Sequence, residues 1–83
     1  MFGKPRSQAI HFQVRNASGA PVRYRVGDDT FTVSPRGVRT HVQCREEALV
    51  LEGARGEGSK AAPRNGESFV VIGDRGRISL RRE

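Results

Sequence analysis

The feature that most constrains the fold of this chain is a series of short runs in which apolar and polar residues alternate. In residues 10–15, for example, Ile10, Phe12 and Val14 are separated by polar side chains. A strand with one buried face shows this period of two because successive side chains point to opposite faces of the sheet. Four consecutive runs follow the pattern, over residues 10–15, 22–26, 30–33 and 38–44. The pattern predicts four strands in the first half.

The second half also favours strands. Residues 48–51 and 69–72 are continuous apolar runs, as in strands buried on both faces, and residues 77–81 alternate again. Gly, Pro, Asn and Asp lie between the runs and no apolar stripe has helical spacing. We therefore expect one all-β domain over residues 1–83, a small antiparallel β-sandwich of about seven short strands. A small β-barrel is the alternative.

The phase of each run predicts which side chains are buried. Cys44 continues the apolar series of Val38, Thr40 and Val42, so we expect a buried thiol there. The expected core is Phe12, Val14, Tyr24, Val26, Phe31, Val42, Leu49, Leu51, Val71, Ile78 and Leu80.

Residues 53–66 differ from the rest of the chain. This segment contains four Gly and no large apolar side chain, so it offers little to bury. Long segments of this kind in small domains are usually mobile or functional. We expect a mobile loop at 53–66.

The charge of the chain is concentrated in its first half. The 83 residues carry a net charge of +6, and residues 1–45 contain eight cations and two acids, whereas residues 46–83 contain seven of each. An excess of positive charge favours anionic partners. A GC-rich coding sequence also yields many Arg codons, so composition alone leaves both readings open.

Catalytic and metal-binding patterns are not evident. His41 and Cys44 are three residues apart, which places their side chains on opposite faces of a regular strand. Two His residues without a third ligand make a poor metal site, and no phosphate-binding glycine motif precedes a helix. We expect no enzyme, no metal, no cofactor and no small-molecule substrate. Without an apolar signal or membrane segment, a cytoplasmic protein that does not bind membranes is expected.

The same strand phase predicts a cationic face. If the first strands lie in one sheet, their polar side chains share its outer surface, and the candidate binding residues are Gln13, Arg15, Arg23, Arg25, Arg39 and His41. Arginine suits phosphate and carboxylate ligands because its guanidinium donates two parallel hydrogen bonds. The sequence thus predicts a small basic binding module for nucleic acid or a nucleoprotein complex. The alternative is a structural or inhibitory protein-interaction domain, such as a small assembly component or a viral or bacterial regulator, which contacts an acidic protein surface.

Overall fold

The computed structural model describes residues 9–54 and 56–83, which form eight strands and one short 3-10 turn. The strands are β1 (Ile10–Asn16), β2 (Val22–Val26), β3 (Asp29–Val33), β4 (Val38–Gln43), β5 (Leu49–Leu51), β6 (Lys60–Ala61), β7 (Glu67–Asp74) and β8 (Arg77–Arg82). The 3-10 turn η1 spans Gly56–Ser59. This part of the chain contains no helix that is long and apolar enough to cross a membrane.

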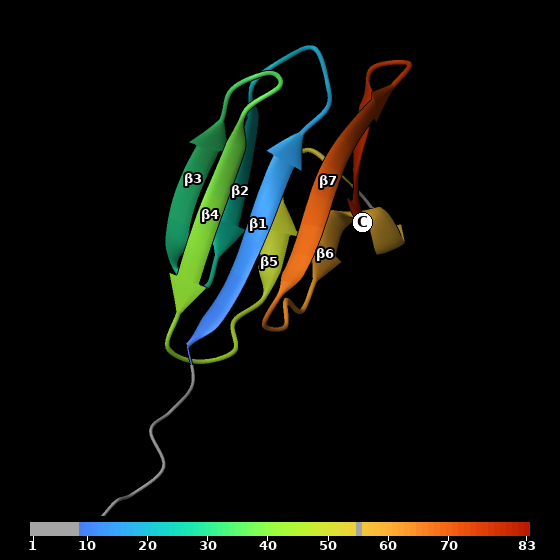
Figure 1. The fold of residues 1–83 in the computed structure, drawn as a ribbon. Helices are drawn as coiled ribbons and strands as arrows, with labels where there is room; N and C mark the ends of the chain where they lie inside the picture. The colour runs from blue at the N-terminus through green and yellow to red at the C-terminus, as the bar shows by residue number, and fades with distance from the viewer. Residues whose placement is uncertain (1–8, 55) are drawn as a thin grey trace, which may run out of the picture.

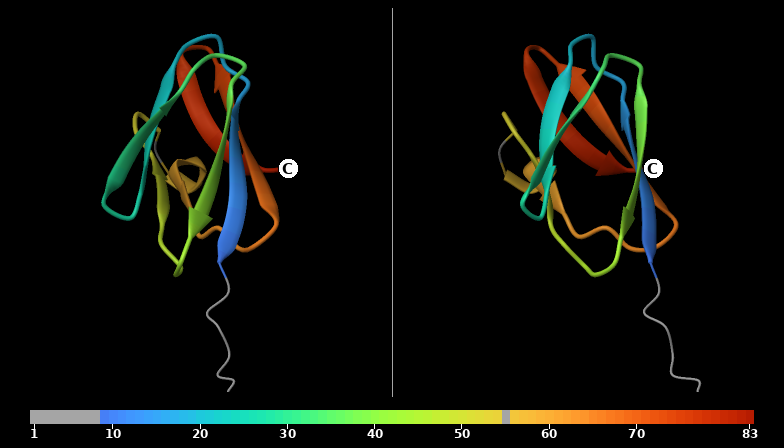
Figure 2. Two further views of the ribbon diagram at one scale, coloured as in Figure 1. Left: turned by 60° about the vertical axis from the view of Figure 1, so that its left-hand side comes forward. Right: turned by 90° about the vertical axis from the view of Figure 1, so that its left-hand side faces the viewer.

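The strands form two sheets of four, in the orders β4-β1-β7-β8 and β3-β2-β5-β6. Figure 1 shows β4, β1 and β7 side by side in the first sheet, with β2 and β5 behind them. The turned views in Figure 2 show the two layers from the side. The predicted all-β sandwich is confirmed, and it is not a closed barrel.

One strand pair departs from the antiparallel expectation. β1 lies in the interior of its sheet, antiparallel to β4 on one side and parallel to β7 on the other. Phe12 is thereby opposite His41 of β4 and Glu67 of β7. The parallel pair joins the beginning of the described chain to its last third, so the first sheet is mixed.

Both sheets contribute to one apolar core. Most of the predicted core is buried, and Phe69 and Val70 of β7 are buried with it. Phe31 and Ile78 are only partly buried at the margins, and Val42 is exposed, contrary to our prediction. The buried apolar residues are Phe12, Val14, Val22, Tyr24, Val26, Val33, Leu49, Leu51, Phe69, Val70, Val71 and Leu80.

The error at Val42 belongs to a reversal of phase along the whole of β4. Val38, Thr40 and Val42 face solvent, whereas His41 is only 5% exposed. The physical reason is the Tyr24 hydroxyl, which lies inside the sandwich and hydrogen-bonds to Nε2 of His41. A buried hydroxyl without a partner costs free energy, so β4 turns a polar ring inward to satisfy it.

Cys44 follows the same reversal. We predicted a buried thiol beside Val42, but Cys44 lies just after the end of β4 and is exposed. The prediction was wrong because it assumed that the valines of β4 point toward the core.

The glycine-rich segment is more structured than its composition suggests. It contains η1 and β6, and β6 pairs with β5. Pro63 within it is buried, and Gly58 lies so close to β8 that a Cβ atom there would be 2.9 Å from Cβ of Ser79. Glycine is thus needed at this position for close packing. Mobility of residues 53–66 stays a prediction.

Candidate binding surfaces

The predicted cationic face is divided between the two sheets. Gln13 and Arg15 are exposed on β1 in the first sheet, while Arg23 and Arg25 are exposed on β2 in the second. In each strand these residues alternate with buried ones, so they point away from the core. The outer surfaces of a sandwich lie on opposite sides of the molecule. The four residues therefore do not form one surface.

The positive charge of Arg15 is compensated. Its guanidinium forms a salt bridge with the carboxylate of Glu83. Val70, which is opposite Arg15 on β7, is nearly buried although it has the outward phase of the strand. Long charged side chains often cover apolar surface in this way. Arg15 is thus engaged within the protein and is a weaker candidate for anion binding than its sequence position indicated.

The outer surface of the second sheet carries cations with fewer internal partners. Arg25 is opposite Thr30 of β3 and Val50 of β5, and Val50 is in turn opposite Lys60 of β6. Arg23 lies next to this row and is 3.9 Å from the Glu52 carboxylate. We call the surface formed by Arg23, Arg25, Thr30, Val50 and Lys60 the β2 face.

Lys60 was not among the candidate binding residues because it lies in the segment predicted to be a mobile loop. The strand that places it beside β5 has only two residues, which are too few to show a periodic pattern in the sequence. Neither Arg25 nor Lys60 forms a salt bridge with any residue whose side chain the structure describes, a set that leaves out residues 55 and 57. Both side chains are exposed.

Arg39 and His41 do not belong to an outward cationic face. Both have the inward phase of β4. The Arg39 guanidinium lies 5.2 Å from the centre of the Phe31 ring, and Nη1 donates a hydrogen bond to the Thr32 carbonyl oxygen at 3.2 Å. Arg39 therefore stays exposed while it covers the side of the sandwich between β4 and β3, whereas His41, which we expected on the outer surface, is buried.

His41 lies in an aromatic cluster. Its ring stacks on Phe12, with 5.0 Å between ring centres, and meets Phe31 and Tyr24 edge-on. Burial lowers the pKa of His41, and the positive charge of Arg39 lowers it further. Burial raises the pKa of Tyr24 to about 12, which Arg39 partly opposes. Both groups are thus held neutral, as a buried hydrogen-bonded pair requires.

Within this cluster His41 hydrogen-bonds to Tyr24 and is shielded from solvent. A general base needs access to a substrate, and His41 is enclosed by three rings. Cys44 is exposed, whereas His41 is buried, so the two do not form a nucleophile and base pair. Among residues 9–54 and 56–83 no group of three His, Cys, Asp or Glu is placed to hold a metal ion.

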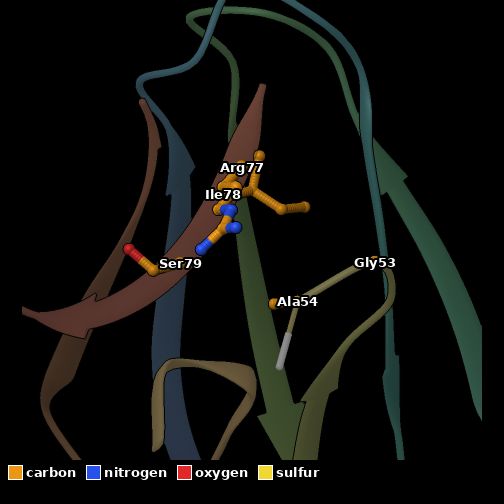
Figure 3. A pocket seen from close by; sticks show the side chains of 5 residues that line it. All are labelled: Gly53, Ala54, Arg77, Ile78 and Ser79. Atoms are coloured by element: carbon orange, nitrogen blue, oxygen red, sulfur yellow. The ribbon is translucent and has the colours of Figure 1, made fainter. Parts of the chain in front are cut away.

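A cavity of about 430 Å³ lies between β8 and the turn that follows β5. Figure 3 shows the side chains that line it, from Gly53 and Ala54 on one side and from Arg77, Ile78 and Ser79 on the other. Arg77 is the ionisable group among these five, and an arginine always carries its proton. The part of the lining that the structure describes therefore offers no acid and base pair.

No protein-family model, no curated protein and no solved structure matches the chain. Its function is therefore argued from its own residues.

Proposed function

We propose that this protein is a non-enzymatic binding module that contacts the phosphate backbone of nucleic acid through its β2 face. The observation that supports this most directly is the row of Arg25 and Lys60, two exposed cations without a salt bridge to any side chain that the structure describes. Cations without internal partners bind phosphates at the lowest cost, because no existing ion pair has to be broken.

The spacing of these cations suits a phosphate backbone. Arg25 and Lys60 are on β2 and β6, which are separated by β5, so their backbones lie about 10 Å apart. Flexible side chains at this separation can contact phosphates of one strand. Arg23 is an additional contact once it leaves Glu52, since 3.9 Å corresponds to a weak surface pair.

Sequence-specific recognition is not part of this proposal. Specific readers of single strands stack bases on exposed aromatic rings. In the described residues Phe12, Tyr24 and Phe69 are buried, and Phe31 is partly buried with Arg39 over its ring. We therefore expect contacts that depend on charge and salt and little on base sequence.

The decisive experiment measures binding to random-sequence RNA and DNA as a function of salt. Replacing Arg25 and Lys60 together by Glu should weaken binding to every sequence, and the slope of log K against log salt should fall by about two, one for each lost phosphate contact. The matched control replaces Arg75 and Arg77 by Glu, which changes the net charge equally at the turn between β7 and β8. Circular dichroism checks that both variants fold.

Two outcomes contradict the proposal. Equal losses in both variants mean that only total charge matters, and no binding by the wild-type protein at low salt excludes nucleic acid. In the second case the β2 face becomes a candidate for an acidic protein surface, the alternative partner predicted from the sequence. A cytoplasmic location stays a prediction that cell fractionation tests.

A further inference from the structure

Within residues 9–54 and 56–83, the backbone of β4 has a strand partner on one side only, and the structure indicates which of its residues point to the other side. The amide of His11 donates to Oδ1 of Asn65, and the His11 carbonyl accepts from the amide of Gly66, so both backbone groups of His11 point away from β4. Backbone direction alternates along a strand, so Phe12 and Val14 are the residues whose groups point toward β4. The amide of Asn16 also follows this alternation, because it donates to the Gly37 carbonyl.

The partners of Phe12 and Val14 on β4 are His41 and Arg39. Their backbone groups are therefore used within the sheet. By the same alternation, the N–H and C=O groups of Val38, Thr40 and Val42 point outward at the edge, because β4 is the last strand of its sheet.

The side chains of these three residues are exposed as well. Val38 is 51% and Val42 is 57% exposed, and they are the exposed large apolar residues of the described chain. Thr40 lies between them, so the outward row of β4 is β-branched and uncharged. Natural edge strands usually carry a charge, a proline or a bulge that prevents pairing with another chain. The edge of β3 has such protection from Arg39, whereas the outward row of β4 has none.

We propose that β4 pairs antiparallel with β4 of a second copy of the chain, about a two-fold axis at Thr40. In this register Val38 of each copy is opposite Val42 of the other, and Thr40 is opposite Thr40. All three positions have free backbone groups, so they form hydrogen-bonded pairs. The two four-stranded sheets then become one sheet of eight strands.

The sequence of β4 favours a second copy over an unrelated strand. The outward residues read Val, Thr, Val in both directions, so the two-fold axis makes each favourable apolar pair twice. The facing residues on the inner side are Arg39 and His41. Burial keeps His41 uncharged, so this register places no like charges directly opposite each other.

Net charge sets the conditions under which the pair forms. Each copy carries +6, so the copies repel at low salt, and the repulsion weakens as salt shortens the screening distance. The interface is one strand wide and therefore small, and we expect association in the micromolar to millimolar range. This inference is independent of the proposed function, because the β2 face lies on the other sheet.

Two measurements on the intact chain test the proposal. Sedimentation equilibrium from about 10 µM to about 1 mM should show a monomer–dimer equilibrium that shifts toward dimer as salt rises. Amide hydrogen exchange should show protection of Val38, Thr40 and Val42 that increases with protein concentration. The amides of Arg39 and His41 should be protected at every concentration, because they already pair with β1.

The variant Val42→Lys adds a charge to the outward row and should weaken dimerisation at least tenfold. Ala62→Lys is the matched control, since it adds the same charge at an exposed position just after β6, an edge strand of the other sheet, and should leave self-association nearly unchanged. Thr40→Pro removes one outward N–H, which an edge strand tolerates, and should also weaken the dimer. Thermal unfolding verifies that each variant folds.

A wild-type protein that stays monomeric at the highest concentration in high salt overturns the proposal. Equal weakening by Val42→Lys and Ala62→Lys also overturns it, because charge alone then explains the effect. If the protein stays monomeric and an unrelated extended peptide protects the amides of Val38, Thr40 and Val42, the edge binds a foreign strand and the second copy is excluded.

Discussion

β2 and β4 have almost the same alternation of residue types, but they turn opposite sets of side chains toward the core. β2 reads Val-Arg-Tyr-Arg-Val and the first five residues of β4 read Val-Arg-Thr-His-Val. β2 buries its two valines and Tyr24, whereas β4 exposes Val38, Thr40 and Val42 and buries His41. The difference shows that apolar alternation predicts a strand but does not by itself fix which face is buried.

Two physical causes explain why the two strands bury different residues. β2 lies between β3 and β5, so its inner side is covered along its length, whereas β4 is at the edge of its sheet. Arg39 can therefore point inward from β4 and still reach solvent over Phe31. The second cause is the Tyr24 hydroxyl, which needs a partner inside the sandwich and finds it in His41.

The largest expected effect follows from removing the ring on which His41 stacks. Phe12 is almost fully buried, and Phe12→Ala leaves a cavity between β1 and β4. We expect the free energy of unfolding to fall by about 3–5 kcal/mol, enough to unfold a small domain of this kind. Urea unfolding followed by circular dichroism measures it. A loss below about 1 kcal/mol would show that the aromatic cluster does not support the orientation of β4.

A smaller effect on stability is expected from truncating Val26 of β2 and Val42 of β4, which are the fifth residues of their strands. Val26 is 1% and Val42 is 57% exposed. Val26→Ala should cost about 2–3 kcal/mol through lost burial and a cavity, and Val42→Ala should change stability by less than about 0.5 kcal/mol. Both are measured by urea unfolding at low protein concentration, where the chain is monomeric. Equal costs would mean that Val42 is buried and that β4 has the phase predicted from its valines.

The smallest expected effect is a pH dependence of stability that His41 of β4 contributes. Burial lowers the pKa of His41 in the folded protein below the ordinary value of 6.5. At a pH between the lowered pKa of the folded protein and 6.5, His41 is protonated in the unfolded chain but not in the folded one. Its contribution to the free energy of unfolding is therefore fully present above about pH 6.5 and is lost as pH falls through the folded pKa.

The variant His41→Gln keeps a polar partner for Tyr24 but does not titrate, so it should lose this dependence. His11→Gln, at an exposed position, should retain it. The measurement is urea unfolding at several values between about pH 7.5 and pH 5.5. Identical slopes for the wild-type protein and His41→Gln would contradict a buried, titrating His41.

The sequence predicted the class of fold because alternation and turn residues agree along most of the chain. It failed at Val42 and Cys44, where the phase depends on a hydrogen bond between strands of different sheets. The clue available was Tyr24, a phenol in an otherwise apolar series, whose inward phase demanded a polar partner. Which residue supplied that partner could not be known before the pairing of β4 with β1.

The candidate site was less predictable than the fold. Outward phase correctly predicted that Gln13, Arg15, Arg23 and Arg25 are exposed. It could not show that the first two lie in one sheet and the last two in the other. The compensation of Arg15 by Glu83 joins residues from the two ends of the described chain. The addition of Lys60 to the β2 face requires β6, whose two residues are too short a strand for any periodic signal.

The parallel pairing of β1 with β7 determines when the domain can form during synthesis. β1 is synthesised before β7, yet β7, which begins at Glu67, is one of its two neighbours. A contact across so much sequence is slow to form because a long loop must close first. Until then β1 has one side unpaired and only β4 as a partner. We therefore expect a nascent chain that ends before β7 to lack a complete core and to depend on the last strands for protection from aggregation.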